Sequence, residues 1–485
     1  MKPIPFFFFN TKTGKKEAFL PKDSNSVTIY SCGPTVYNFA HIGNIRSFLF
    51  VDILRRSLLL GGYKLNQSMN ITDIDDKIIN ASIKQNISVE EFTKPWTEAF
   101  FKDLETLQIH RLEHYPKATE SIDDMVSLVE ILQSNGLAYE REGNVYFSIQ
   151  KFQRYGELSK IDVSGMKSGV RYDADEYEKD DVRDFVLWKN QKTKEEKCWH
   201  TRIGMGRPGW HLECSAMIRK IYGTGVDIHT GGIDLLFPHH ENEFAQSVGA
   251  YPEEQFVGTW LHCEHLLVDG EKMSKSKGNF YTLRDILEKG FEPKVIRFHL
   301  ISAHYRSKLN FSLAKLEESK VALDRIQNTI YRLLETGSLW NQIPEESLIK
   351  NFSLKEIETL NSDFLNAIAD DLNIPKALAT LFEFVRLVNL TLDQSKDEIS
   401  NEFYEESLVF FCKLNALFAV FSFEKTKETL DGISEEWILK QISNRKIAKQ
   451  NKDFATADNI RKELELKGIL LADTKEGNTT WKKAL

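Results

Sequence analysis

Long apolar runs are missing from this sequence. No segment approaches the roughly 20 apolar residues that a membrane-spanning helix needs, and the apolar run 4–9 has neither the length nor the cleavage site of a signal peptide. The 485 residues are 41% hydrophobic and 28% charged, which is typical of a globular chain long enough for two or more domains. We therefore expect a cytoplasmic protein without membrane contact.

Cysteine is also scarce. The five cysteines are an odd number and lie far apart in a chain without an export signal, so we do not expect a disulfide framework. In the simplest interpretation each is a small buried side chain. The five are Cys32, Cys198, Cys214, Cys263 and Cys412.

The chain has fewer basic than acidic residues, 63 against 71. The net charge of −8 argues against a protein that coats nucleic acid without selectivity. The segment 440–485 is different, because it contains 11 basic and 6 acidic residues, a net charge of +5. Basic side chains together with Trp481 suit an unpaired RNA loop, although a solvated helical cap better explains a Lys-rich helix taken alone.

The beginning of the chain has the pattern of a strand, a helix and a second strand. Residues 27–33 form a β-rich run that ends in Gly-Pro, a helical pattern follows as far as Gly61, and residues 63–71 are strand-like again. Such a βαβ unit belongs in a parallel sheet, whose ligands bind beyond the carboxyl ends of the strands. We therefore expect the chemistry in the loop 33–44.

The predicted fold class is α/β. A Rossmann-type catalytic domain contains a more polar insertion without sharp motifs, and after about Ser312 the pattern is almost wholly helical, which indicates a bundle followed by a small C-terminal module. The predicted ranges are 1–115 and 198–311 for the two halves of the catalytic domain, 116–197 for the insertion, 312–430 for the helical bundle and 431–485 for the module.

Two short motifs suit the handling of a polyanion. In the first, residues 41–44, His41 and Asn44 can donate hydrogen bonds to phosphate oxygens at a helix N-terminus, and Gly43 allows close approach; Asn44 as a plain helix cap is an equally good explanation. The second is Lys272-Met273-Ser274-Lys275-Ser276, on a loop between two glycines. Its two lysines suit charge that grows during phosphoryl or nucleotidyl transfer, although most Lys-Ser runs are solvated loops.

In this order, with a βαβ opening, the two motifs resemble the HIGH and KMSKS signatures of class I aminoacyl-tRNA synthetases. The KMSKS match is complete, whereas Asn44 stands where the first signature has histidine and cannot carry its charge. The resemblance implies ATP as substrate, with Mg²⁺, and nucleotide contacts by Gly43 and Asn44. It also implies that His41, Lys272 and Lys275 stabilise charge, since an ionised carboxylate substrate needs no base.

Four further residues form a candidate metal set. His239 and Glu243 are four apart, which on a helix beginning at Pro238 places them on one face, and two thiolates, from Cys32 and Cys214, would complete a plausible zinc set. The cysteines are far apart and lack the short spacing of structural zinc modules, so a buried thiol and a helix cap remain alternatives.

The surroundings of these residues resemble the cysteinyl-tRNA synthetase family. The matching runs are CGPTVY (32–37), NITDIDDK (70–77), GRPGWHLECSAM (206–217), DIHTGGID (227–234) and FPHHENE (237–243). The resemblance implies that Cys32, Cys214, His239 and Glu243 hold one Zn²⁺. It further implies a cysteine pocket lined by Thr72, Trp210, His229 and Asp234.

The expected partners are L-cysteine, ATP and tRNA(Cys), with the C-terminal module reading the anticodon, and we expect a monomer. Zinc would explain how cysteine is selected, because pocket shape separates near-isosteres by a factor of only roughly 10 to 200, whereas zinc binds sulfur well. Catalytic zinc usually has three protein ligands, and this set has four. Either the zinc becomes five-coordinate when the substrate binds, or Glu243 is a weak ligand that leaves the zinc. The alternatives are an ATP-dependent ligase joining cysteine to a sugar amine and a catalytically silent paralogue.

Overall fold

The computed structural model describes residues 3–161, 184–274, 278–337, 352–395, 398–424, 435–450, 453–473 and 479–483. Contacts within the chain divide it into two compact units, Met1–Phe421 and Ser422–Leu485. Each unit has a hydrophobic core of its own. In the described parts of the chain, no helix is both long and apolar enough to cross a membrane.

A four-stranded parallel sheet forms the centre of the first unit. Ile29 and Ile228 lie opposite each other in neighbouring strands and are fully buried, as expected for a sheet covered on both faces. The strand order is β11 (Val257–Cys263), β10 (Val226–Gly232), β3 (Val27–Ser31) and β4 (Leu65–Met69), and α1 (Ile42–Leu60) connects β3 to β4. The predicted α/β class with a parallel sheet is therefore confirmed. A hairpin of β1 (Phe7–Asn10) and β2 (Lys15–Ala18) precedes this sheet.

An antiparallel sheet lies between the two halves of the parallel sheet in sequence. Asp76, at the start of α2, binds Lys189 and Arg207 of this sheet and joins it to the catalytic part. Its strand order is β5 (Ala138–Arg141), β6 (Asn144–Phe147), β7 (Phe185–Asn190), β9 (Gly204–Pro208) and β8 (Trp199–Thr201), so it extends beyond residue 197. The helices α2 (Asp76–Gln85), α3 (Val89–Thr106) and α4 (Ile122–Ser134) precede it.

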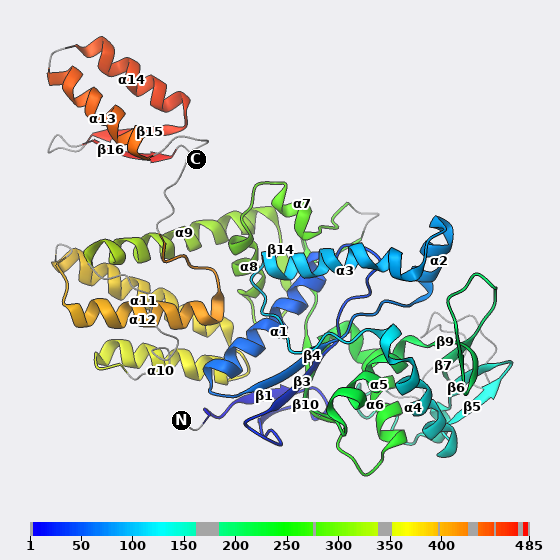
Figure 1. Cartoon of the computed structure of the whole chain (residues 1–485). Coiled ribbons are helices and arrows are strands. Elements are labelled where there is room, and N and C mark those ends of the chain that lie inside the picture. Colours follow the sequence, from blue (N-terminus) through cyan, green and yellow to red (C-terminus); the bar gives the residue numbers. More distant parts are fainter. Residues whose placement is uncertain are drawn as a thin grey trace. The chain divides into compact units, whose positions relative to one another are not determined.

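The rest of the first unit is mostly helical. In Figure 1 the helices α9 to α12 lie on one side of the parallel sheet and the antiparallel sheet lies on the other. The elements after β9 are α5 (Trp210–Tyr222), α6 (Glu241–Ala250), β12 (Leu266–Val268), β13 (Glu271–Lys272), α7 (Leu283–Leu287), α8 (Pro293–Ile301), β14 (Leu309–Phe311), α9 (Leu313–Thr336), α10 (Lys355–Ala369), α11 (Ile374–Ser395) and α12 (Asn401–Phe418).

A buried carboxylate connects α1 to this helical region. Asp52 Oδ2 accepts hydrogen bonds from Arg56 Nε at 2.7 Å and from Arg297 Nη2 at 2.5 Å. The same two guanidinium groups donate to main-chain carbonyls at the end of α12, Arg56 to Ala416 at 2.9 Å and Arg297 to Phe418 at 2.6 Å. Burial opposes ionisation of Asp52, but the two arginines outweigh it and hold the pKa of this carboxyl below its ordinary value.

The second unit packs two helices against a two-stranded hairpin. Its buried core consists of Ile438, Leu464, Ile469 and Leu471, and Trp481 packs half-buried against it. The tryptophan that suggested RNA stacking therefore also serves this core. The elements are α13 (Glu435–Gln450), α14 (Phe454–Leu466), β15 (Ile469–Asp473) and β16 (Thr479–Lys483).

Candidate active site and metal centre

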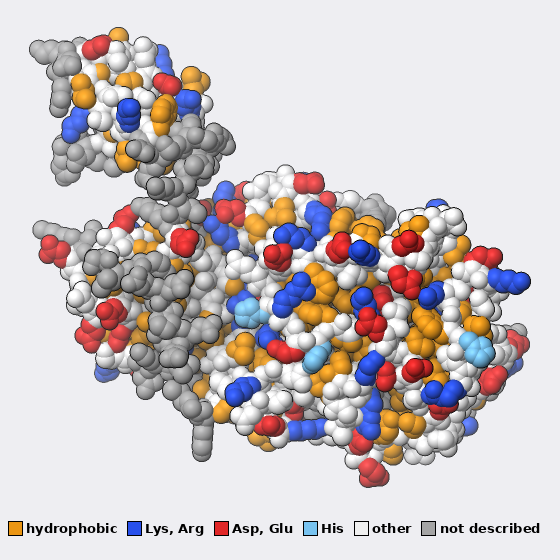
Figure 2. All heavy atoms as spheres, viewed as in Figure 1, with side chains coloured by type: hydrophobic (Ala, Val, Ile, Leu, Met, Phe, Trp, Pro, Cys, Tyr) orange, Lys and Arg blue, Asp and Glu red, His pale blue; other side chains and the backbone are white. Residues whose placement is uncertain are grey.

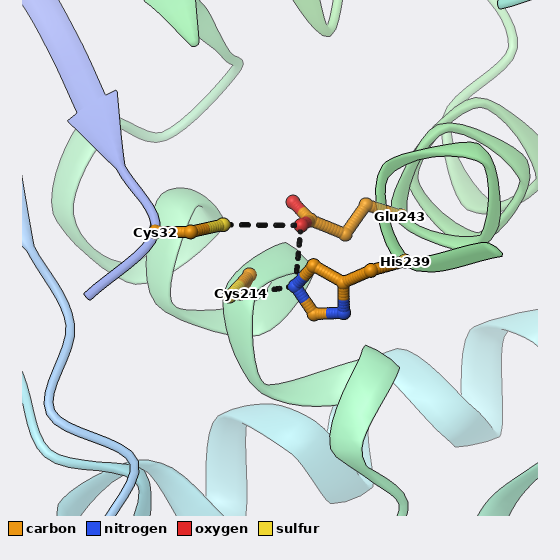
Figure 3. Close-up of side chains that lie close together, drawn as sticks. All are labelled: Cys32, Cys214, His239 and Glu243. Atoms are coloured by element: carbon orange, nitrogen blue, oxygen red, sulfur yellow. Dashed lines mark hydrogen bonds and ion pairs between the residues drawn. The ribbon is translucent and has the colours of Figure 1, made fainter. Parts of the chain in front are cut away.

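Four predicted ligands come together at the carboxyl edge of the parallel sheet. Cys32 directly follows β3, Cys214 lies on α5, His239 lies in the turn just before α6, and Glu243 lies in the first turn of α6 (Figure 3). One donor atom from each lies within 4.8 Å of the donors of the other three. Cys214, His239 and Glu243 are buried, and Cys32 is half-buried.

The contacts inside this cluster are short. The His239 Nε2 atom lies 2.9 Å from Glu243 Oε1 and 3.5 Å from Cys214 Sγ. The Cys32 Sγ atom lies 3.7 Å from Glu243 Oε1. Two sulfurs, one imidazole nitrogen and one carboxylate oxygen, all turned toward one another in a buried site, match the donors that zinc accepts.

The helical segment that carries His239 and Glu243 has two parts. α6 begins at Glu241 rather than at Pro238, and residues 236–240 form a single π-helical turn before it. Phe237 has an extended backbone (φ −140°, ψ 131°), so the continuous helical backbone that leads into α6 starts after it, at Pro238. His239 and Glu243 nevertheless face each other, because the backbone from Pro238 onward turns as a helix.

Burial and charge together set the protonation of the cluster. Burial opposes the thiolate of Cys214, but its hydrogen bond with Cys32 and the neighbouring His239 lower its pKa to about 6. Burial likewise opposes the cationic form of His239, yet Glu243 raises its pKa to about 10. The pKa of Glu243 falls well below its ordinary value, since His229 and His239 outweigh its burial. The site is therefore arranged to hold a thiolate beside a carboxylate.

Three histidines that the sequence analysis did not single out surround the cluster. His211 Nδ1 lies 3.0 Å from His239 Nδ1, and His240 Nε2 lies 3.2 Å from Cys32 Sγ. His240 Nδ1 lies in turn 2.8 Å from His262 Nε2. The doubled histidine of FPHHENE was a signal for His240, which belongs to a second possible ligand group. That group is Cys32, His229, His240 and Glu243.

Three of the residues predicted for the cysteine pocket lie beside the cluster. The indole of Trp210 stacks on the His239 ring with centroids 4.4 Å apart, and His229 Nε2 lies 2.9 Å from Glu243 Oε2. Thr72 is buried and donates to the carboxylate of Glu213, the neighbour of Cys214, at 2.9 Å.

Asp234 lies apart from these three. Its side chain is exposed on the turn after β10, and its charge acts on His41, where it opposes the lowering of the pKa by burial. The structure thus groups Asp234 with the first motif.

The first motif caps the N-terminus of α1, but the capping residue is not the one expected from the sequence. His41, not Asn44, is the N-cap: its Nδ1 accepts from the Asn44 N–H at 3.1 Å, and Asn44 Oδ1 accepts from the His41 N–H at 3.3 Å. Because Nδ1 accepts, the proton of the neutral ring is on Nε2. His41 can therefore donate from Nε2 beside a helix N-terminus, where anions bind.

The second motif lies against the first. Lys272 is exposed on β13, and the Met273 methyl group lies where a Cβ atom at Gly43 would come within 2.8 Å of it. The side chain of Asn279 contacts the segment before this loop: it donates to the Lys272 carbonyl at 3.2 Å and accepts from the Ser274 N–H at 2.8 Å. Lys275 and Ser276 lie outside the described residues.

Comparisons with known proteins identify the family of this chain. A family model described as the tRNA synthetases class I (C) catalytic domain matches residues 18–321, and a DALR domain model matches residues 363–421. A cysteine–tRNA ligase of Leptospira interrogans is 58% identical over 481 residues, 99% of this chain and 100% of the relative. One of Brachyspira hyodysenteriae is 45% identical over 98% of this chain and 99% of its own length.

The fold likeness extends to more distant solved structures. Methionyl-tRNA synthetase of Mycobacterium tuberculosis, solved with methionyl-adenylate, is 11% identical and superposes with a TM-score of 0.56, covering 81% of this chain and 89% of that one. At this identity the likeness concerns the fold alone. The sequence matches along nearly the whole chain show that it belongs to the cysteine–tRNA ligase family of class I tRNA synthetases.

Proposed function

We propose that this chain activates L-cysteine with ATP and transfers the cysteinyl group to the 3′ end of tRNA(Cys). The observation that carries the proposal is the buried cluster of Cys32, Cys214, His239 and Glu243 in a chain of this family. Its two sulfurs, imidazole and carboxylate suit zinc, which would supply a Lewis acid that takes the substrate thiolate as a ligand. A neutral serine hydroxyl would gain little from the same ion.

Adenylate formation in this proposal needs charge stabilisation rather than proton transfer. A carboxylate oxygen of cysteine attacks the α-phosphorus of ATP, the bond to the β-phosphate oxygen breaks, and pyrophosphate leaves, with Mg²⁺ accompanying the nucleotide. His41 donates from Nε2, and Lys272 and Lys275 offset the charge that develops on the phosphates. Gly43 and Asn44 bind the nucleotide at the start of α1.

In the second step a ribose hydroxyl at the tRNA 3′ end attacks the carbonyl carbon of the adenylate. The bond from this carbon to the phosphate oxygen breaks, the hydroxyl proton passes to the leaving phosphate, and AMP departs. Thr72, Trp210, His229 and Asp234 orient the aminoacyl group in both steps. We assign the protein to the cytoplasm and propose that it is a monomer, since the ligands of the candidate site all come from one chain.

Pyrophosphate exchange tests the proposal. Exchange should require cysteine, should be far slower with serine, and should not need tRNA, and the protein should then charge tRNA(Cys). Absence of exchange in folded protein would favour a silent paralogue. Exchange without tRNA charging would revive the sugar-amine ligase, which the comparisons do not support, since the similar full-length relatives are cysteine–tRNA ligases.

A further inference from the structure

Two exposed aromatic rings lie on the loop between the candidate metal ligand Cys32 and the first motif. Tyr37 is 39% exposed and Phe39 is 36% exposed, although most large apolar side chains of this unit are buried. Each ring has a cation over it. Lys77 Nζ on α2 is 5.1 Å from the centre of the Tyr37 ring, and the Arg284 guanidinium on α7 is 3.9 Å from that of Phe39.

Contacts with α3 and α7 hold the Phe39 ring in place. The Phe39 ring packs edge-on against Trp96 of α3, with centroids 5.1 Å apart, and Arg284 is fixed by Asp103 at 2.9 Å. The loop itself is anchored where the Val36 N–H donates to the Thr72 carbonyl at 3.1 Å. We name the group Tyr37, Phe39, Lys77, Trp96 and Arg284 the rim cluster. Its members lie on the loop and on the helices α2, α3 and α7, and they contact one another.

The charges around the rim cluster leave one cation available. The charge of Arg284 is offset by Asp103, and Asp76, next to Lys77, is engaged by Lys189 and Arg207. Lys77 is exposed and interacts electrostatically with Asp75, the N-cap of α2, but it makes no ion pair with any residue in the described ranges. A phosphate group beside Tyr37 would therefore meet an ammonium group that no described ion pair engages.

We propose that the rim cluster binds the unpaired 3′-terminal nucleotides of the tRNA, with bases stacked on Tyr37 and Phe39 and a phosphate on Lys77. This inference rests on the proposed function. Aromatic faces with nearby cations are how proteins bind single-stranded RNA, since every base has a face that can stack. Acidic and basic side chains are interspersed on the face of the first unit shown in Figure 2, so that face offers no broad basic surface for a duplex.

The position of the cluster fits this ligand. The loop that carries both rings starts at Cys32 and ends at His41, so an RNA strand stacked on it lies beside the two candidate sites it must reach. In Figure 1, α7, α3 and α2 follow one another along one edge of the first unit, which gives the strand a continuous path over helices that contact each other.

The test compares two RNAs on two proteins. Dissociation constants are measured for wild type and Phe39→Ala, with full-length tRNA(Cys) and with tRNA lacking its unpaired 3′ nucleotides. We expect about tenfold weaker binding of the full-length tRNA by the variant and equal binding of the shortened tRNA by both proteins. Lys77→Gln should lower the slope of log affinity against log salt by roughly 0.7, the value for one phosphate contact on a single strand.

Phe7→Ala is the matched control, because Phe7 is 43% exposed and lies on β1, outside the cluster. An equal loss with both RNAs would show that Phe39 contacts another part of the tRNA, and an unchanged affinity for both would show no contact; either overturns the inference. Cysteine-dependent pyrophosphate exchange by wild type in the same preparation separates these results from a failure of the proposed function.

Discussion

The side chain of Met273, in the second motif, lies directly over Gly43, in the first motif. A Cβ atom at Gly43 would lie 2.8 Å from Met273 Cε and 3.0 Å from the His41 ring. We predict that Gly43→Ala folds normally, since the end of a methionine side chain can move, but slows adenylate formation by up to about 100-fold by displacing His41. Adding Met273→Ala should recover part of the loss, because it removes one of the two crowded contacts. Pyrophosphate exchange by both single variants and the double variant measures the coupling; strictly additive losses would contradict it.

Removing one ligand should release the metal. We expect about one zinc per chain in the purified protein, and weaker zinc binding in Cys214→Ser and in His239→Ala, because each removes a buried donor of the four-atom cluster. Metal content after dialysis against a chelator is the measurement. Cys412→Ser, which changes a cysteine of α12 outside the cluster, is the control and should keep its zinc. Full activity of metal-free protein would refute the zinc assignment.

Lys275→Ala should raise the activation barrier of adenylate formation without changing the affinity for cysteine. The proposed role concerns charge that grows as pyrophosphate leaves, so we expect a loss of about 2.7 to 4 kcal/mol in transition-state stabilisation, the range for one catalytic donor. Exchange kinetics at varied cysteine and ATP concentrations give the two effects separately. Lys64→Ala, at an exposed lysine outside both motifs, should change neither. Unchanged turnover with altered cysteine affinity would contradict this role.

Asp52→Asn should destabilise the first unit by about 3 to 5 kcal/mol at pH 7, because it leaves two buried guanidinium groups without their carboxylate. The folded pKa of Asp52 lies below its ordinary value of about 3.9. Its stabilisation is therefore fully present above that pH and is lost as the pH falls through the folded pKa.

Urea unfolding of both proteins between pH 3 and 7 tests this pH dependence. The difference in free energy of unfolding should stay constant down to about pH 4 and shrink below it. Asp393→Asn is the control, since Asp393 pairs with Arg332 at the surface and its loss should cost under about 1 kcal/mol. A difference that grows toward low pH would disprove the assignment.

A chain that ends at Phe421 should still form the adenylate, because the first unit contains all the proposed catalytic and ligand residues. It should charge tRNA poorly, through weaker binding with a smaller salt dependence, since the basic segment 440–485 is removed. Exchange and charging rates at two salt concentrations provide the measurement. Normal charging by the shortened chain would show that tRNA recognition does not need the second unit.

The central fold could be predicted because it depends on local patterns. The apolar run 27–33, the helix up to Gly61 and the strand that follows lie close together in sequence, and only a parallel arrangement accommodates them. The candidate ligands are distant in sequence and were found by family resemblance. The structure brings them to one edge of the sheet.

The surroundings of the ligands could not be predicted in the same way. His262 reaches His240 because β11 pairs with β10 so that Gly231 lies opposite His262, and this register has no local signal. The helical turn that starts at Pro238 agrees with the prediction, whereas its π-helical form before α6 was not predicted.

The arginine contacts at the end of α12 also bear on how this protein can evolve. Arg56 and Arg297 hold the carbonyl oxygens of Ala416 and Phe418, and every amino acid supplies that oxygen. Side chains at this junction can therefore drift in the helical region while the junction persists. The three charged residues have less freedom, because losing Asp52 leaves two buried guanidinium groups without a carboxylate, and losing either arginine removes the donor to both Asp52 and a main-chain carbonyl. Among related proteins, Asp52, Arg56 and Arg297 should be inherited or replaced as a set.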